Sequence, residues 1–219
     1  MDSTLVIMLL EGTRDTLYMT LVATLFGYVI GLPLGVILTI TDVDGITPNT
    51  VIYKILDVIV NLLRSIPFLI LLILVIPLTR FLVGKSYGST ATIVPLVIAA
   101  APFIARVVES SLKEVDKGVI EAATSMGAGT WTIITKVLLA EAKTSLLVGV
   151  TIVLGTILGY SAMAGAVGGG GLGDIAIRYG YYRYQTDIMV VTIVILVILV
   201  QILQGIGMMI SKKLDHRRV

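Results

Sequence analysis

Two glycine motifs in this sequence have the spacing of nucleotide-binding loops. The run Gly84–Ser86 reads Gly-Lys-Ser, the end of the phosphate-binding pattern GxxxxGK[ST], and the run Gly168–Gly173 satisfies GxGxxG. The first pattern needs a further glycine five residues before Gly84, where the chain has Thr79. The second must follow a β-strand, whereas here it follows a long apolar segment. Both matches are interpreted as accidental, so we expect no ATP site in this chain.

Metal and thiol chemistry are excluded by composition. The chain has no cysteine, and its one histidine, His216, stands in a charged C-terminal tail. Disulfides, thiol catalysis, cysteine-ligated metals and histidine metal clusters are therefore ruled out. The formal net charge of +2 is weak, and we expect no nucleic-acid partner. The sequence predicts a chain that is not an enzyme and that binds no cofactor or metal of its own.

The composition indicates a lipid environment instead. Hydrophobic residues make up 57% of the chain, its mean hydropathy is +1.03 and charged residues make up 14%, against about 25% in a soluble domain. The N-terminal sequence has no basic start and reaches Glu11 after a short apolar run, so it is not a signal peptide. The hydrophobic signal therefore belongs to the mature protein, and residues 1–15 are expected outside the membrane or at its surface.

Five charge-poor segments each reach the roughly 20 residues that a transmembrane helix needs. The second contains one charge, Arg64, and the fourth runs into the glycine-rich stretch, where we expect the helix to end. None alternates apolar and polar residues as the strands of a membrane barrel do. The sequence thus predicts an all-α integral membrane protein. The expected spans are residues 16–41, 58–79, 86–105, 144–167 and 188–211, followed by a tail of residues 212–219.

The distribution of basic residues predicts the orientation. With the C-terminus in the cytoplasm and the N-terminus outside, the cytoplasmic side carries most of the lysines and arginines, as the positive-inside rule requires. The tail 212–219 is then cytoplasmic. The basic residues on the cytoplasmic side are Lys54, Arg106, Lys113, Lys117, Lys136, Lys143, Lys212, Lys213, Arg217 and Arg218, and those outside are Arg14, Arg80, Lys85, Arg178 and Arg183.

The cytoplasmic loop 106–143 is longer than a connection between neighbouring helices needs. Its apolar residues recur at helical spacing in two halves, which Gly127 and Gly129 separate, and Thr130 is placed to cap the second half. Two short amphipathic helices are therefore predicted. Their apolar faces can dock on the membrane surface, on the spans of this chain or in a groove of a separate protein, and the pattern does not decide. These apolar residues are Val119, Ala122, Ala123, Met126, Ile133, Ile134, Val137 and Leu138.

This loop resembles the EAA loop of bacterial ABC importer permeases. Glu121–Ala123 provide the residues EAA, Gly127 follows after three residues, and Val137–Leu139 follow after nine more. The family pattern ends in I-x-L-P, so Val137 replaces isoleucine and Ala140 replaces proline. We expect the second replacement to loosen the turn into the fourth span. The motif stands two spans before the C-terminus, as it does in the family.

Other segments resemble the methionine importer permeases of this family. They are Arg64–Phe68, Ala101–Arg106 and the run from Gly159 to Tyr181, and the likeness extends over about residues 10–211. The resemblance implies a compact five-span type I permease that forms the path for methionine across the bacterial cytoplasmic membrane. It also implies a homodimer of permease chains on two ATP-binding cassette ATPase subunits, which bind Mg-ATP, with a methionine-binding (lipo)protein outside.

The same resemblance implies roles for individual residues. Glu121, Ala122, Ala123 and Gly127 are assigned to a coupling helix that docks in a cleft on the ATPase. The small residues allow close approach, and Glu121 provides a charge for the helix N-terminus or for a basic partner. Closure of the ATPase dimer on ATP then draws the coupling helices together and turns the path outward.

Two further candidates come from the second and fourth spans. Met163 stands among small residues near the outer end of the fourth span, so Met163 with Ser161 and Ala162 is a candidate constriction of the path. The alternative is a core methionine that fills a gap. Arg64 is the one charge well inside a span, where it costs about 2.5–3.5 kcal/mol. It is expected to face a water-filled path or to anchor near the inner interface, and the interface is favoured.

Two other functions are weighed against the permease. A stand-alone secondary amino-acid transporter or small channel usually places acidic or histidine residues in its spans, and the five expected spans contain none. A membrane scaffold would leave the amphipathic loop unexplained. The permease subunit of an ABC importer is therefore the favoured interpretation.

Overall fold

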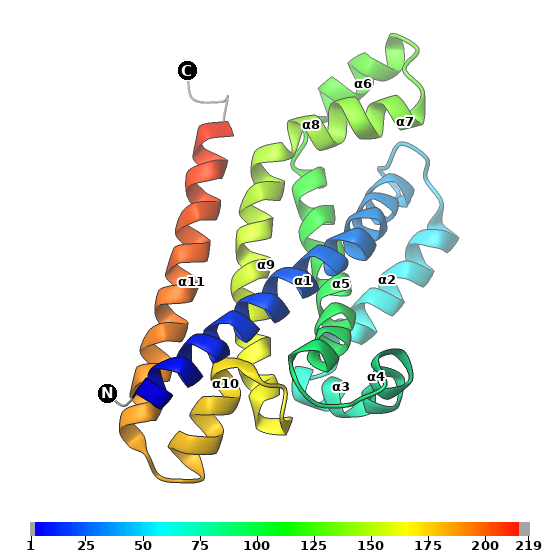
Figure 1. Ribbon diagram of the computed structural model, residues 1–219. Coiled ribbons are helices and arrows are strands. Elements are labelled where there is room, and N and C mark those ends of the chain that lie inside the picture. The colour runs from blue at the N-terminus through cyan, green and yellow to red at the C-terminus, as the bar shows by residue number, and fades with distance from the viewer. Residues whose placement is uncertain (1–2, 215–219) are drawn as a thin grey trace.

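A computed structural model describes residues 3–214, and within this range every regular element is a helix (Figure 1). The predicted all-α class is therefore confirmed. Four helices are long and apolar enough to cross a membrane, and a bent pair brings the number to five if it counts as one span. The tail residues His216, Arg217 and Arg218 lie outside the described residues.

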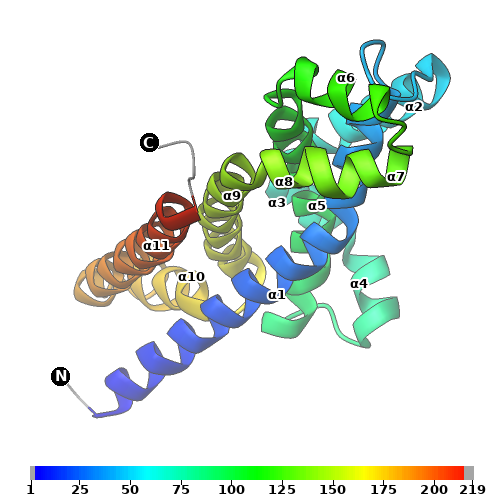
Figure 2. The ribbon, with the colours of Figure 1, turned by 90° about the horizontal axis from the view of Figure 1, so that it is seen from above.

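The four long helices are α1 (Ser3–Thr41), α5 (Ser89–Lys113), α9 (Lys143–Ala164) and α11 (Thr186–Leu214). Helix α5 is central, because 56% of its apolar window is buried against other helices, whereas the value for α11 is 11%. Helix α1 crosses α5 obliquely, and α11 stands at the edge of the bundle (Figures 1 and 2). The core between α1, α5 and α9 includes Met19, Leu96, Ile104 and Ile157.

The second expected span, 58–79, is not one straight helix. The chain forms α2 (Thr50–Ser65), α3 (Phe68–Leu74) and α4 (Ile76–Val83), and α2 and α3 are bent by 101°. Pro67 explains the break, because a proline pushes the preceding residue out of the helical region and lacks an N–H group. Ile66 is accordingly extended, with φ −78° and ψ 123°. Phe68 then stacks on Tyr160 of α9 with ring centres 4.6 Å apart.

The other expected spans correspond to helices, but several helices extend beyond them. Helix α1 begins at Ser3 and not near Thr16, and α5 continues through Arg106 to Lys113. Charged residues such as Glu11 and Glu109 are compatible with a helix, so a charge marks the edge of the lipid contact and not the end of the helix. The fourth expected span corresponds to α9, which is followed by a 3-10 turn over Gly165–Val167. The fifth corresponds to α11, and the bounds of both differ less from those expected.

Small residues let α1 pass close to α5. A β-carbon added at Gly35 would lie 2.6 Å from the carbonyl oxygen of Ala105 and 2.6 Å from Cβ of Val108. Gly31 meets α5 in the same way one turn earlier, at the carbonyl oxygen of Ala101. The glycines of the first span are therefore contact residues between two crossing helices, the use of small residues expected in membrane bundles.

Replacing Gly35 by alanine is expected to destabilise the protein by about 1–3 kcal/mol, because the added methyl group must push the two backbones apart. The measurement is the thermal unfolding midpoint of the purified protein in detergent. Gly205→Ala in α11 is the matched control, since nothing lies within 4 Å of a β-carbon there. Helix propensity alone would stabilise both variants by up to about 1 kcal/mol, so an unchanged or raised midpoint in Gly35→Ala would contradict the role of the α1–α5 contact.

The glycine-rich run after α9 folds back onto the bundle. Gly168 and Gly170 have φ values of +77° and +78°, which side chains other than glycine rarely adopt. The carbonyl of Gly168 accepts from the amide of Gly88 at 2.9 Å, and the amide of Leu172 donates to Oγ1 of Thr16 at 2.9 Å. Helix α10 (Gly171–Ile175) and a π-helical segment, η3 (Ala176–Tyr181), follow. Helix α9 ends at Ala164, just before this run, as the glycine-rich composition predicted.

The predicted amphipathic loop contains two helical arms at one end of the bundle (Figure 1). Helix α6 (Lys117–Ser125) is the first arm, and α7 (Thr130–Thr132), a π-helical segment η1 (Ile133–Leu138) and α8 (Leu139–Glu141) form the second. Gly127, with φ +79°, makes the turn between them. Thr130 does not cap the second arm, because Gly129 holds the N-cap position and no side-chain hydrogen bond is made there.

Candidate functional site

Helix α6 and the turn that follows it present most of the EAA residues to the outside. Glu121, Ala122 and Gly127 are exposed, whereas Ala123 is buried and belongs to the core cluster. The N-cap of α6 is Asp116, whose carboxylate accepts from the amide of Gly118 at 2.7 Å. Glu121 is therefore not the N-cap residue of α6, and its expected interaction with a basic partner stays a prediction.

The two arms of the loop use their apolar residues differently. In the second arm, Ile133, Ile134 and Leu138 are buried against this chain's own core. Around the turn, Met126 and Trp131 keep 82% and 76% of their surface exposed. The second arm is thus docked on the spans of its own chain, while the turn carries large apolar side chains that nothing in the described chain covers. Exposed Met and Trp side chains beside small residues suit a protein-binding surface.

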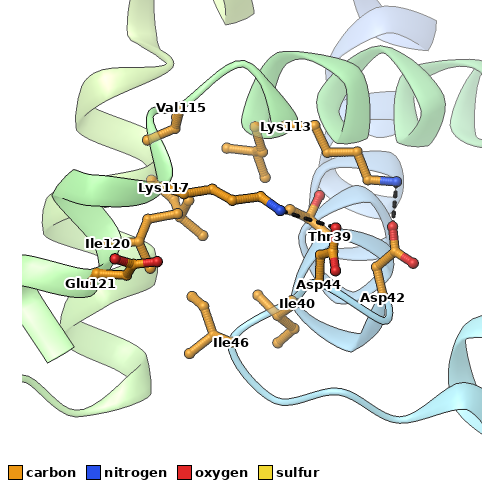
Figure 3. A pocket seen from close by; sticks show the side chains of 13 residues that line it. Thr39, Ile40, Asp42, Asp44, Ile46, Lys113, Val115, Lys117, Ile120 and Glu121 are labelled. Carbon is orange, nitrogen blue, oxygen red and sulfur yellow. Dashed lines mark hydrogen bonds and ion pairs between the residues drawn. The ribbon is translucent and has the colours of Figure 1, made fainter.

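A cavity of about 530 Å³ opens beside α6 (Figure 3). One wall comes from the end of α1 and the segment that joins α1 to α2, Asp42–Asn49, which we call the α1–α2 segment. The other wall comes from the end of α5 and from α6. Its floor is aliphatic and its rim is charged. The lining includes Ile40, Asp42, Asp44, Ile46, Lys113, Lys117, Ile120 and Glu121.

Behind this cavity lies an inner charge network of five residues from α2, α5 and the α1–α2 segment. Glu109 is 5% exposed and accepts from Arg106 at 2.6 Å and from Lys113 at 2.8 Å. Arg106 also pairs with Asp57 of α2, and Lys113 pairs with Asp42 at 2.6 Å. Each charge in the network has an opposite charge beside it, which is the condition for burying ionic groups without a large penalty.

The hydrogen bond from Lys113 is the main reason that the pKa of the Asp42 carboxyl is lowered from its ordinary value. The bond stabilises the charged form of Asp42 in the folded protein. Its contribution to stability is therefore present above the ordinary pKa of an aspartate, and it is lost as the pH falls through the lowered value.

The sequence reasoning did not find this network. It assigned Arg106 and Lys113 to a loop and found no acidic residue inside the expected spans. The folded helices α2 and α5 do contain Asp57 and Glu109, and both are ion-paired. The sequence does contain one indication of the network. Arg106, Glu109 and Lys113 are three and four residues apart, which is the spacing at which side chains on one helix meet.

The three candidate gate residues near the end of α9 do not share one environment. Ser161 is buried and donates to the carbonyl oxygen of Leu158 at 2.8 Å, and Ala162 is packed by its backbone against Gly173 of α10. Met163 is 49% exposed. Met163 is therefore not a core side chain of the single subunit, and it is the most exposed of the three residues.

Met163→Ala is expected to raise ATP hydrolysis without substrate, or ion leak, by about twofold or more if Met163 narrows the path. The shorter side chain would leave the constriction open, since alanine lacks the flexible thioether that fills gaps. The measurement is basal ATPase activity and leak in proteoliposomes that contain the complete transporter. Unchanged behaviour of this variant would contradict the gate role.

Arg64 lies in the last turn of α2, at the end of that helix away from the loop arms, and it is exposed (Figure 1). A cation in the last turn interacts favourably with the helix dipole. This position is far from the end of the bundle that carries α6. The two roles expected for Arg64, facing a water-filled path or anchoring near the inner interface, stay predictions.

Comparison with known proteins supports the likeness seen in the loop. Residues 31–216 match the family described as the binding-protein-dependent transport system inner membrane component. A probable D-methionine transport system permease protein, MetI, of Vibrio cholerae is 52% identical over 210 residues, which are 96% of this chain and 93% of that protein. The methionine import system permease protein MetP of Bacillus subtilis is 47% identical over 207 residues, which are 94% of this chain and 93% of MetP.

Solved structures share the fold. A chain of the MetNI methionine ABC transporter in an inward-facing conformation superposes with a TM-score of 0.97 and 48% identity, covering 99% of this chain and 100% of that one. An amino acid ABC transporter crystallised with histidines has a TM-score of 0.77 at 19% identity, with 94% of both chains covered, and this similarity concerns the fold alone.

With its apolar helices, the chain is a multi-pass protein of the cytoplasmic membrane. It belongs to the family of binding-protein-dependent transport system inner membrane components.

Proposed function

We propose that this chain is the permease subunit of an ATP-binding-cassette importer and forms the path for methionine across the cytoplasmic membrane. The relatives of 52% and 47% identity are named as methionine permeases, and the MetNI structure of 48% identity is a methionine ABC transporter. These likenesses cover nearly the whole chain. The substrate therefore follows from similarity throughout the protein and not from one motif.

The observation that carries the mechanism is the exposed turn of the loop. Glu121 and Ala122 on α6 are exposed beside Met126 and Trp131, although the second arm of the same loop is firmly packed. A charged group and small residues next to large apolar side chains fit a socket on a second protein. We assign that socket to a separate ATPase subunit, which binds Mg-ATP and performs the hydrolysis. This chain then has no catalytic residue, and its own sites hold no cofactor or metal.

The assembly proposed here has two copies of this chain, two ATPase subunits and an external methionine-binding (lipo)protein. A second copy is supported by the exposed apolar surface of α11, whose window is 11% buried within one subunit, although lipid also covers such surfaces. The loop arms and the end of α11 with Lys212 and Lys213 lie at the same end of the bundle (Figure 1). The positive-inside rule makes this end cytoplasmic, so the C-terminus is inside and the N-terminus outside.

Uptake of labelled methionine tests the proposal. Proteoliposomes contain this chain, the partner ATPase and the binding protein, and uptake is followed with and without ATP. Uptake that requires ATP and all three proteins supports both the importer class and the substrate. Stimulated ATP hydrolysis without methionine uptake keeps the class and rejects the substrate. Uptake that ignores ATP and the partner chains would indicate a stand-alone carrier or channel.

A further inference from the structure

Helix α6 and the α1–α2 segment face each other across the cavity of about 530 Å³ (Figure 3). Ile120 of α6 and Ile46 of the α1–α2 segment both line it. A cavity wall lacks the van der Waals contacts that hold packed elements together. Ile120 and Ile46 both pack against the same hydrophobic core, but across the open space α6 and the α1–α2 segment can be joined by side chains that reach over it.

An ion pair makes such a contact. Nζ of Lys117, at the start of α6, lies 3.0 Å from Oδ2 of Asp44 in the α1–α2 segment. Figure 3 shows the lysine side chain extended over the opening toward the carboxylate. The pair thus joins the helix that carries Glu121 to the turn that follows α1, across the mouth of the cavity.

The inner charge network continues this connection into the bundle. Asp42, two residues before Asp44, pairs with Lys113 of α5, and Lys113 pairs with the buried Glu109. Through Arg106 the network reaches Asp57 of α2. Tyr53 of α2 adds a hydrogen bond to Glu109 at 3.4 Å. Charged contacts therefore run from α6 through the α1–α2 segment to α5 and α2.

We propose that Lys117 and Asp44 are positioning residues for ATP-coupled transport, and that they make the α1–α2 segment follow the movement of α6. This inference rests on the proposed function of α6 as the coupling helix. When the partner ATPase moves α6, the Lys117–Asp44 pair transmits the displacement to the α1–α2 segment, and the inner charge network transmits it to α2 and α5. Without the pair, α6 moves across the cavity while α1 and α2 lag behind.

The exposure of the pair separates this role from a purely structural one. The side chains of Lys117 and Asp44 are 71% and 75% exposed, and ion pairs on the surface contribute little to stability. Breaking the pair should therefore leave folding unchanged. The same weakness limits the effect on coupling, so we expect the methionine moved per ATP hydrolysed to fall about two- to fivefold.

The test compares K117D, D44K and the double variant D44K/K117D in proteoliposomes with the partner ATPase and the binding protein. Methionine uptake and ATP hydrolysis are measured together, and thermal unfolding is recorded for each variant. We expect each single variant to lower the uptake per ATP while its unfolding midpoint stays within about 1 °C of wild type. The double variant restores the ion pair with its charges exchanged, so it should recover most of the ratio.

Single variants with the wild-type ratio would overturn the proposal, and so would a double variant no better than the worse single one. If wild type hydrolyses ATP but does not import methionine, the substrate assignment fails, and stimulation of the ATPase by this chain becomes the readout for the same variants. If the single variants then stimulate the ATPase less and the double variant restores the stimulation, the positioning role is supported. If all variants stimulate the ATPase as wild type does, the positioning role is overturned.

Discussion

Glu121→Lys is expected to reduce ATP-dependent methionine uptake by about a hundredfold or more. Glu121 is exposed on α6, in the part of the loop where Met126 and Trp131 are exposed as well. If this surface becomes buried against a basic group of the ATPase, reversing the charge places two cations together in a desolvated contact. Disrupting a buried charge pair at an interface costs about 2–5 kcal/mol or more, and each 1.4 kcal/mol corresponds to about a tenfold change in equilibrium.

The measurement is uptake together with co-purification of the ATPase. Glu114→Lys is the matched control, because Glu114 is an exposed acid at the end of α5, shortly before α6, and undergoes the same change of charge. We expect that control to retain most of its uptake. Uptake by Glu121→Lys within about twofold of wild type would show that Glu121 does not face the partner.

The second large effect is expected at Glu109, where replacement by alanine should destabilise the protein by about 3–5 kcal/mol. The carboxylate is 5% exposed and lies between Arg106 and Lys113. Without it, Arg106 keeps Asp57 and Lys113 keeps Asp42, but each cation loses its charge-assisted hydrogen bond to the buried carboxylate. A hydrogen bond to a charged group contributes about 1.5–3 kcal/mol, so the loss of both bonds gives a destabilisation of this size.

Thermal unfolding in detergent measures this effect. Glu114→Ala removes an exposed carboxylate from the end of the same helix, and we expect its stability to change by no more than about 0.5 kcal/mol. Glu109→Gln keeps the size and one acceptor oxygen, so it should fall between wild type and Glu109→Ala. A stable Glu109→Ala variant would mean that the network is hydrated and does not hold α5 to α2.

Much of the fold could be predicted because lipid imposes a simple rule on the sequence. Every spanning backbone must satisfy its own hydrogen bonds, so long charge-poor segments become helices. The rule locates the part of a helix that faces lipid and gives no information on where the helix ends. The third span was therefore expected to end just before Arg106, whereas α5 continues to Lys113. The direction of the chain after Pro67 depends on packing, including the Phe68–Tyr160 stack, and composition does not reveal it.

The candidate site was predicted in part for a similar reason. The EAA residues form a local pattern, so α6 could be located from the sequence. Which side of α6 stays exposed depends on how the second arm packs, because Ile133 and Leu138 occupy the core that Ala123 also reaches. The cavity and the partners Asp42 and Asp44 come from a segment distant in sequence, and no spacing rule connects them to Lys113 and Lys117.

The π-helical segment Ile133–Leu138 also affects how this chain can be aligned with sequences of other lengths. A π turn contains one more residue than an α turn over nearly the same rise. Losing a single residue between 133 and 138 would convert the wide turn into an ordinary one, and the side chains of α9 would keep their directions. A one-residue gap is therefore best placed in this segment, whereas a gap inside α9 would rotate every following side chain by about 100°.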